Sequence, residues 1–304
     1  MVVGSNVETG LIVEVSPERG RLAAARAALW RFVRRKPLGA VGGAIILAFI
    51  VVAVFADLIA PYPYDQIHRG DRLQGPSTEY WFGTDNLGRD LFSRIVYGAR
   101  ISLFVGGGAT LISIGLGTML GVMSGYLGGK LDIFLQRLVD IWISFPGLIL
   151  IISFLAIVGP GLTSVIVVLG IIGASRVIRV TRGATIGIRQ NTYIEGGRVV
   201  GAHDLRIMAR YILPNIFAVI MVLATVELGG FILAEATISF LGYGVPPPTP
   251  TWGQMLSGSG AQYMLQQPGM AFWPGFALAI VVFGFNMLGD ALRDVLDPRL
   301  RGGR

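Results

Sequence analysis

The segment at residues 193–215 reads YIEGGRVVGAHDLRIMARYILPN, and its composition differs from that of the chain on either side. It is polar and charged, it has Gly201 near its middle, and long apolar runs flank it. The flanking runs point to a membrane protein. A patterned, charged segment between such runs is the first candidate for a functional site.

The composition favours a membrane protein over a soluble one. Of the 304 residues, 53% are hydrophobic and 14% are charged, whereas soluble domains carry about 25% charged residues. The 43 glycines suit close helix packing in lipid. The net charge of +7 comes from basic residues beside apolar runs, so we expect membrane lipid and no nucleic acid as a partner. The absence of cysteine excludes disulfides, thiol nucleophiles and cysteine-ligated metals.

Six apolar runs are long enough to cross about 30 Å of hydrocarbon as helices. Their continuity favours helices over a barrel. We therefore predict an all-α polytopic membrane protein with six transmembrane helices, at residues 38–59, 101–126, 138–158, 162–180, 216–240 and 272–288. The domain layout is a cytoplasmic N-terminal tail at 1–37, a six-helix domain at 38–290 and a cytoplasmic C-terminal tail at 291–304.

The placement of Lys and Arg predicts the orientation, because these residues accumulate on the cytoplasmic side of a membrane. Both termini and the segment 193–215 fall on one side, and that side is rich in Lys and Arg. The predicted outer loops hold few of them: Arg69, Arg72, Arg89, Arg94 and Arg100. We therefore expect both termini and the segment 193–215 to be cytoplasmic.

The segment 193–215 predicts two short helices joined by a glycine turn. Residues 195–200 form the first helix, and Gly201 allows a sharp turn. Asp204 is placed to cap a second helix at 205–213 by accepting hydrogen bonds from its free amides. In that helix one face is apolar, with Leu205, Met208 and Ile212 at helical spacing. Such an element suits insertion into a groove of a partner, and the alternative is a solvated loop attracted to anionic lipid.

The pattern Glu195-Gly196-Gly197, Gly201 and Pro214-Asn215 resembles the EAA loop of permease subunits in bacterial ABC importers, which docks the permease onto its ATPase. The family usually has Glu-Ala-Ala, and glycine lowers helix stability by about 1 kcal/mol relative to alanine. The docking residues that the resemblance implies are Glu195, Gly196, Gly197, Gly201, Ala202, Asp204, Arg206, Arg210 and Pro214.

Further motifs extend the resemblance over almost all of residues 31–299. In order, they are WFGTD at 81–85, GRD at 88–90, residues 97–102, DIWISFP at 140–146, AEA at 234–236, SFLG at 239–242, residues 247–253 and NMLGDALRDVLDPR at 286–299. These motifs are similar to those of the dipeptide/oligopeptide permeases, and the outer segment and tail are most similar to the C-type permease of each pair.

The resemblance implies a type I ABC importer permease fold in the bacterial inner membrane. The implied partners are a second, B-type permease, two cytoplasmic ATPases and an extracytoplasmic substrate-binding protein. Di- or oligopeptides are the leading substrates, and nickel chelates, glutathione or another small solute are the alternatives. A secondary transporter would often show inverted repeats, and a membrane enzyme would need clustered catalytic groups; neither stands out in the sequence.

No cofactor or metal is expected on this chain. Its Gly128-Gly129-Lys130 sequence lacks the spacing and the hydroxyl of a phosphate-binding loop, so ATP and Mg²⁺ are expected on the partner ATPases. His68 and His203 are predicted on opposite sides of the membrane, with no metal-ligand spacing. We therefore expect a transport subunit with no catalytic residues.

Two acids at membrane depth are candidates for the substrate path. An ionised group near the bilayer centre costs about 3 kcal/mol or more unless it is paired or hydrated. Glu227 either faces a translocation path, where it would meet a peptide amino group, or joins helices through hydrogen bonds. For Glu235, nearer the outer interface, the structural role is favoured.

Three local features complete the predictions. Glycines every fourth residue, at 117, 121, 125 and 129, predict close packing of the second span against another helix. Pro146 predicts a kink in the third span, either static or a hinge. Residues 88–94 are predicted to form a short amphipathic helix at the outer surface.

Overall fold

The computed structural model describes residues 23, 26–27, 30–34 and 36–296. Most of the predicted N-terminal tail and the end of the predicted C-terminal tail lie outside these residues. The described part is helical apart from loops and one isolated antiparallel bridge between Thr84 and Asp90. The all-α prediction is therefore confirmed.

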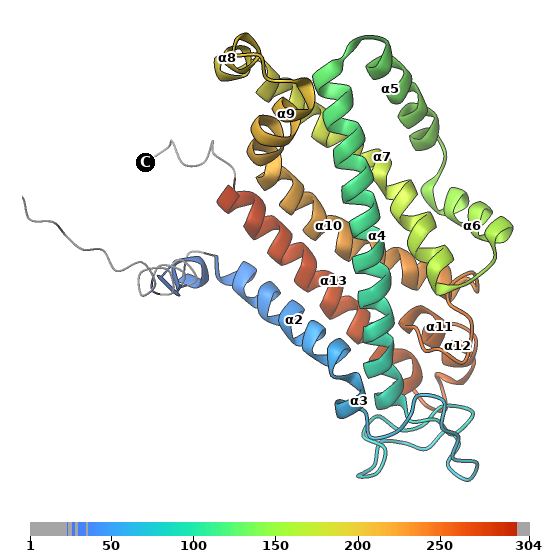
Figure 1. The fold of residues 1–304 in the computed structure, drawn as a ribbon. Helices are drawn as coiled ribbons and strands as arrows, with labels where there is room; N and C mark the ends of the chain where they lie inside the picture. Colours follow the sequence, from blue (N-terminus) through green and yellow to red (C-terminus); the bar gives the residue numbers. More distant parts are fainter. Residues whose placement is uncertain (1–22, 24–25, 28–29, 35, 297–304) are drawn as a thin grey trace, which may run out of the picture.

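The helices follow one another along the chain as α2 (Pro37–Val54), α3 (Ala56–Ile59), α4 (Leu91–Leu127), α5 (Gly129–Ser144), α6 (Gly147–Val158), α7 (Leu162–Arg189), α8 (Thr192–Val199), α9 (Asp204–Ile207), the π-helical η1 (Met208–Ile212), α10 (Leu213–Phe240), α11 (Trp252–Leu256), α12 (Ser259–Tyr263) and α13 (Gly269–Leu296). The long helices α2, α4, α7, α10 and α13 run side by side (Figure 1). The short helices α8 and α9 lie at one end of this bundle, and the loop after α3 lies at the other.

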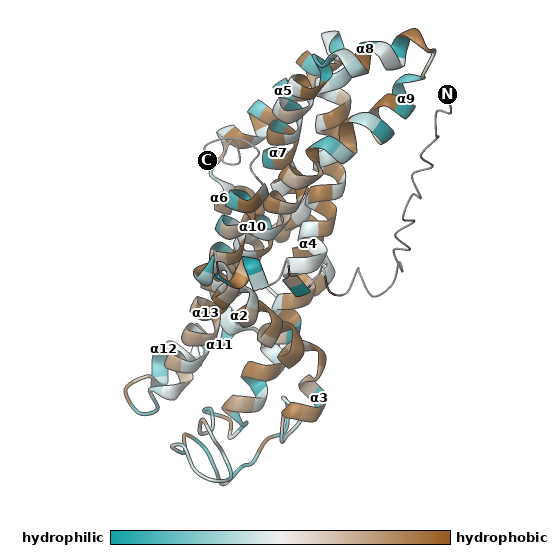
Figure 2. Cartoon of the chain, turned by 90° about the vertical axis from the view of Figure 1, so that its left-hand side faces the viewer, coloured by the Kyte–Doolittle hydropathy of each residue, from teal (hydrophilic) through white to brown (hydrophobic). Residues whose placement is uncertain are grey.

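Five helices in the described residues are long and apolar enough to cross a membrane: Pro37–Val54, Leu91–Leu127, Leu162–Arg189, Asp204–Phe240 and Gly269–Val295. Figure 2 shows that these helices are mostly hydrophobic and that the more polar α8 and α9 lie at one end. The remaining predicted span, at 138–158, corresponds to α5 and α6. These two helices meet at an angle of 93°.

The bend between α5 and α6 lies at the predicted kink and is larger than a kink within one helix. Phe145 ends α5 in an extended conformation, and Pro146 precedes the first residue of α6. Proline has no N–H to continue the preceding helix and disfavours a helical residue before it. The kink predicted at Pro146 is therefore a full break in the helix. The predicted count of six spans is reached when this bent pair is counted as one span.

The start of α4 corrects a second prediction. The Asp90 side chain accepts a hydrogen bond from the Ser93 N–H at 2.8 Å, which caps a helix start. The helix then continues without interruption to Leu127. The predicted short surface helix at 88–94 is therefore wrong, because residues from Leu91 onward are the first turns of the second span.

The glycine spacing in α4 marks the packing face against α7, as predicted. A Cβ atom on the α4 glycines at this face would collide with α7, at Gly117, Gly121 and Gly125. At this contact the Thr181 hydroxyl donates to the carbonyl of Gly117 at 3.2 Å. Gly129 has no neighbour of this kind and begins α5. Small residues thus let the two backbones approach closely over three turns.

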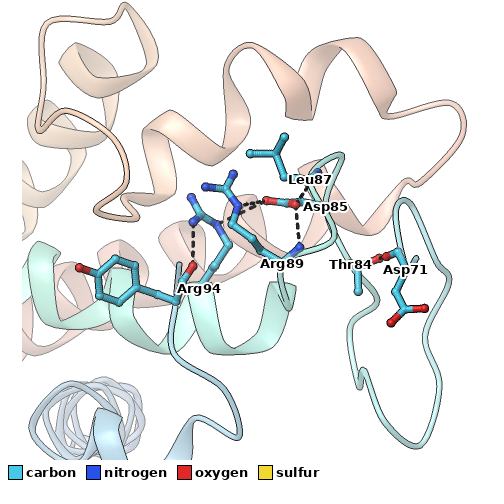
Figure 3. Close-up of polar contacts among 7 residues, drawn as sticks. Asp71, Thr84, Asp85, Leu87, Arg89 and Arg94 are labelled. Atoms are coloured by element: carbon cyan, nitrogen blue, oxygen red, sulfur yellow. Dashed lines mark hydrogen bonds and ion pairs between the residues drawn. The ribbon is translucent and has the colours of Figure 1, made fainter. Parts of the chain in front are cut away.

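The loop before α4, which was predicted to lie outside the membrane, is held by a buried cluster of charges (Figure 3). The Asp85 carboxylate accepts hydrogen bonds from the Leu87 N–H at 2.8 Å, from the Arg89 N–H at 3.0 Å and from Arg89 Nε at 2.7 Å. Arg94 Nε lies 3.8 Å from the same carboxylate. A guanidinium nitrogen of Arg94 donates to the Tyr64 carbonyl at 3.1 Å. The WFGTD and GRD motifs therefore fix the loop onto the start of α4.

A second set of contacts in this loop centres on Asp71. The Thr84 hydroxyl donates to the Asp71 carbonyl (Figure 3), and the Tyr80 hydroxyl donates to the Asp71 carboxylate at 2.9 Å. Burial, and after it the contact with Asp71, raises the pKa of Tyr80 above its ordinary value. Tyr80 therefore stays protonated and acts as a donor that ties the loop together.

Candidate functional site

The turn of the segment 193–215 forms around Gly201, as predicted. Gly201 has φ of +83°, a conformation that glycine adopts without steric cost. Its N–H donates to the Arg198 carbonyl at 2.9 Å, and the Ala202 N–H donates to the Gly197 carbonyl at 3.0 Å. These bonds close the end of α8 in the manner of a glycine C-cap. We call α8, the Gly201 turn and α9 the tip.

The second half of the tip differs from the prediction. No separate helix at 205–213 exists, because α9, η1 and α10 form one continuous candidate span, Asp204–Phe240. Pro214 lies in the first turn of α10, directly after the π-helical η1. Asp204 does not cap the helix, since the N-cap residue is His203 and it makes no side-chain capping bond. The tip is therefore continuous with the fifth predicted span.

Tyr126, at the end of α4, joins both halves of the tip. Its hydroxyl donates to the Asp204 carboxylate at 2.7 Å and accepts from Arg198 Nε at 3.4 Å. The Arg198 guanidinium lies 5.1 Å from the centre of the Tyr126 ring, within cation–π range. Tyr126 was not predicted from the sequence, because 72 and 78 residues separate it from Arg198 and Asp204.

The underside of the tip is part of the core. Ile194, Ile207 and Ile212 are fully buried and pack with Val122 and Tyr126. The predicted apolar stripe is therefore split, since Ile212 faces this core while Leu205 is 75% exposed. The apolar side chains left on the outer surface of the tip are Val199, Val200 and Leu205, of which the two valines are each 88% exposed.

The structure brings all the predicted docking residues to this end of the bundle. None of them is buried. Gly197 and Ala202 are half-buried, and the exposed ones are Glu195, Gly196, Gly201, Asp204, Arg206, Arg210 and Pro214. An exposed apolar patch with charged neighbours at the end of a helix bundle is suited to contact another protein.

Glu227 lies in a cavity of about 600 Å³ between α7, α10 and α13. Its carboxylate is nearly buried, and its Oε1 atom lies 3.6 Å from a guanidinium nitrogen of Arg176 without forming a hydrogen bond. Asp290 and Arg293 of α13 also line the cavity. Of these four residues, only Glu227 was predicted from the sequence as a candidate, because the proximity of the four depends on how three helices pack.

Glu235 lies in a different environment. Its side chain is fully buried and accepts a hydrogen bond from the Ser239 hydroxyl at 2.6 Å, one turn along the same helix. It does not line the cavity around Glu227. The hydrogen bond to Ser239 stays within α10, so the helix-packing role that was favoured for Glu235 over a role in the substrate path stays a prediction.

The described residues hold no group of three or more His, Asp or Glu side chains placed to bind a metal ion. The candidate site has two parts, the tip and the charged cavity around Glu227.

Two family comparisons cover most of the chain. Residues 117–302 match the family described as "Binding-protein-dependent transport system inner membrane component". Residues 25–76 match the N-terminal transmembrane domain of oligopeptide transport permease C.

The chain belongs to the family of binding-protein-dependent transport system inner membrane components.

Curated relatives agree with this assignment. The chain is 42% identical over 269 residues, 88% of each protein, to the dipeptide transport system permease protein DppC of Alkalihalophilus pseudofirmus. It is also 42% identical over 274 residues, 90% of each protein, to the glutathione transport system permease protein GsiD of Escherichia coli. The protein is thus a permease subunit of an ABC importer, a membrane protein with a role in transport rather than catalysis.

Proposed function

We propose that this permease forms half of the translocation path of an importer for short peptides. Its partners are a B-type permease, two cytoplasmic ATPases and an extracytoplasmic binding protein, and ATP and Mg²⁺ bind to the ATPases. The observation that carries this proposal is the position of the nine predicted docking residues, which gather in and beside the tip at one end of the helix bundle of a protein of the importer family. Alternating access follows when closure of the ATPases moves the tip.

Peptides remain the leading substrates, with glutathione, nickel chelates or another small solute as alternatives. The relatives named for dipeptide and for glutathione transport are equally similar to this chain. Glutathione is itself a small peptide with free amino and carboxylate groups, so both names point to the same class of solute. A secondary transporter is disfavoured, because the chain belongs to a family of binding-protein-dependent systems.

The same proposal places both termini and the tip in the cytoplasm of a cell with this importer in its inner membrane. Lys and Arg residues are frequent on that side of the chain and scarce in the predicted outer loops. A cytoplasmic tip is in reach of the ATPases. Its exposed valines and Leu205 then supply apolar contacts, while Glu195, Arg206 and Arg210 supply charges at the edge of the contact.

The Gly201 turn offers a direct test. Gly201→Asp adds a side chain and a charge at a position with φ of +83°, so we expect uptake by membrane vesicles to be abolished while membrane insertion stays normal. Gly187→Asp is the matched control, because Gly187 is exposed in α7 with no heavy atom near the added Cβ. Normal uptake by the Gly201 variant would refute the role of the tip.

A further inference from the structure

The cavity around Glu227 contains charges of both signs, and these are only partly paired. Arg176 contributes from α7, Glu227 from α10, and Asp290 and Arg293 from α13. Two cations face two anions, so the lining is close to neutral overall. Charged side chains among membrane-spanning helices are costly and mark substrate or ion pathways. A purely structural role would be expected to pair them fully.

Glu227 is the lining residue with the clearest free hydrogen-bond acceptor for a ligand. Its side chain is only 9% exposed, and its Oε1 atom has no hydrogen-bond partner. The nearest cation is Arg176, at 3.6 Å, beyond the range of a good hydrogen bond. Buried carboxylates are normally hydrogen-bonded, so an unbonded one at a cavity wall has room for an incoming donor.

The other three charged groups are also available. The Arg176 side chain lines the cavity, is 69% exposed and has Glu227 as its partner. Asp290 and Arg293 are exposed, and neither side chain forms a hydrogen bond or ion pair with another described residue. The volume of about 600 Å³ lies within the range of small-molecule sites, about 300–1,000 Å³.

We propose that this cavity is a binding site for a zwitterionic solute, with Glu227 receiving an ammonium group and Arg176 a carboxylate. The ligand inserts between the two side chains and replaces their long contact with two charge-assisted hydrogen bonds, which are the stronger kind. Asp290 and Arg293, both on α13, contribute a second anion and a second cation to the lining. Solutes with a net charge, such as phosphate esters, fit this neutral lining poorly.

This inference rests on the proposed import of peptides and specifies which residues contact them. A short unmodified peptide carries an ammonium and a carboxylate, which are the two groups that the cavity can pair. A peptide with either end blocked loses one of these contacts. Selection for the two free ends would thus occur in the permease, in addition to any selection by the binding protein.

The test uses the complete importer in proteoliposomes, with excess binding protein loaded with a labelled dipeptide so that capture does not limit uptake. The variants are Glu227→Gln, Arg176→Gln and the double variant. Loss of one charged hydrogen bond predicts a fall in maximal uptake of about tenfold or more for each single variant. The double variant is expected to be slower than either single variant. Arg179→Gln is the control, since Arg179 pairs with Asp140 at 2.8 Å outside the cavity.

If Glu227 and Arg176 formed only a structural ion pair, the double variant would take up solute faster than the single variants. Replacing both partners of such a pair removes the unpaired buried charge, so the double variant would recover uptake toward the wild-type rate. That result, or wild-type uptake by both single variants, would overturn the proposed site. ATP hydrolysis stimulated by the loaded binding protein is measured in parallel. Failure of the proposed importer itself would appear differently, as an absence of ATP-driven uptake by the wild-type assembly.

Discussion

At the scale of single residues, Tyr126 is the side chain on which the attachment of the tip depends most. It is 3% exposed and contacts Arg198 of α8 and Asp204 of α9. A force applied to the tip by a partner would therefore reach α4 through one phenol group, in addition to the isoleucine core below it. We regard Tyr126 as a positioning residue, since nothing places it in the substrate path.

Tyr126→Phe removes the hydroxyl and leaves the ring. We expect a loss of about 1 kcal/mol of stability, typical of one hydrogen bond, and a severalfold fall in the ratio of solute transported to ATP hydrolysed, because the tip is less firmly tied to α4. Uptake and ATP hydrolysis by the reconstituted importer give this ratio.

Tyr193→Phe is the matched control for Tyr126→Phe. Tyr193 is exposed in α8, and its hydroxyl accepts one long contact from Asn191 at 3.5 Å. We expect the transport ratio of this variant to be unchanged. An unchanged ratio for Tyr126→Phe as well would show that the hydroxyl plays no part in coupling.

Residue-level prediction from sequence succeeded where the information was local. Gly201 was recognised because a left-handed turn between two short helices favours glycine. Asp204 was misassigned as a helix cap, because its true partner, Tyr126, lies 78 residues away. Arg176 and Asp290 were missed as companions of Glu227, since only the packing of α7, α10 and α13 brings them to one cavity.

At the scale of elements, the close approach of α4 and α7 depends on glycines that leave room for the opposite backbone. Gly121→Ala places a methyl group against Thr181 and the carbonyl of Ile178. Overpacking of this kind costs about 1–3 kcal/mol, so we expect a lower midpoint of thermal unfolding in detergent. Gly115→Ala in the same helix is the control, because no heavy atom lies within 4 Å of its added Cβ.

The two alanine variants should have different effects on the midpoint of thermal unfolding. Alanine is favoured over glycine in a helix by about 1 kcal/mol, so Gly115→Ala should keep or raise the midpoint. Equal midpoints for the two variants would mean that α4 and α7 do not pack as described.

The elements also show where sequence patterns fail. The stripe at Gly117, Gly121 and Gly125 was read correctly, because a spacing of four residues places side chains on one helix face. The join from α9 through η1 to α10 was not predicted, since the sequence was divided into a short helix at 205–213 and a separate span at 216–240. The 93° break between α5 and α6 was foreseen as a kink at Pro146, but its size depends on the contacts of both helices with α7.

At the scale of the whole molecule, orientation in the membrane can be tested by cysteine labelling. The chain has no cysteine, so one introduced thiol is the only reactive site. Val199→Cys at the tip and Thr78→Cys in the outer loop are both at exposed positions. We expect a membrane-impermeant maleimide to label Thr78→Cys from outside intact cells and Val199→Cys only in inside-out vesicles. The reverse pattern would place the tip outside the cell.

The docking of the tip to ATPases is tested most directly by affinity purification of the tagged chain from its native membrane in mild detergent, followed by mass spectrometry. We expect the wild-type chain to bring with it a second permease and two ATPases. Val200→Asp, which puts a charge on the exposed apolar patch, should keep the second permease and lose the ATPases. Leu265→Asp, an equally exposed change outside the tip, should keep both. A wild-type chain that purifies without ATPases, or a Val200→Asp chain that retains them fully, would contradict docking through the tip.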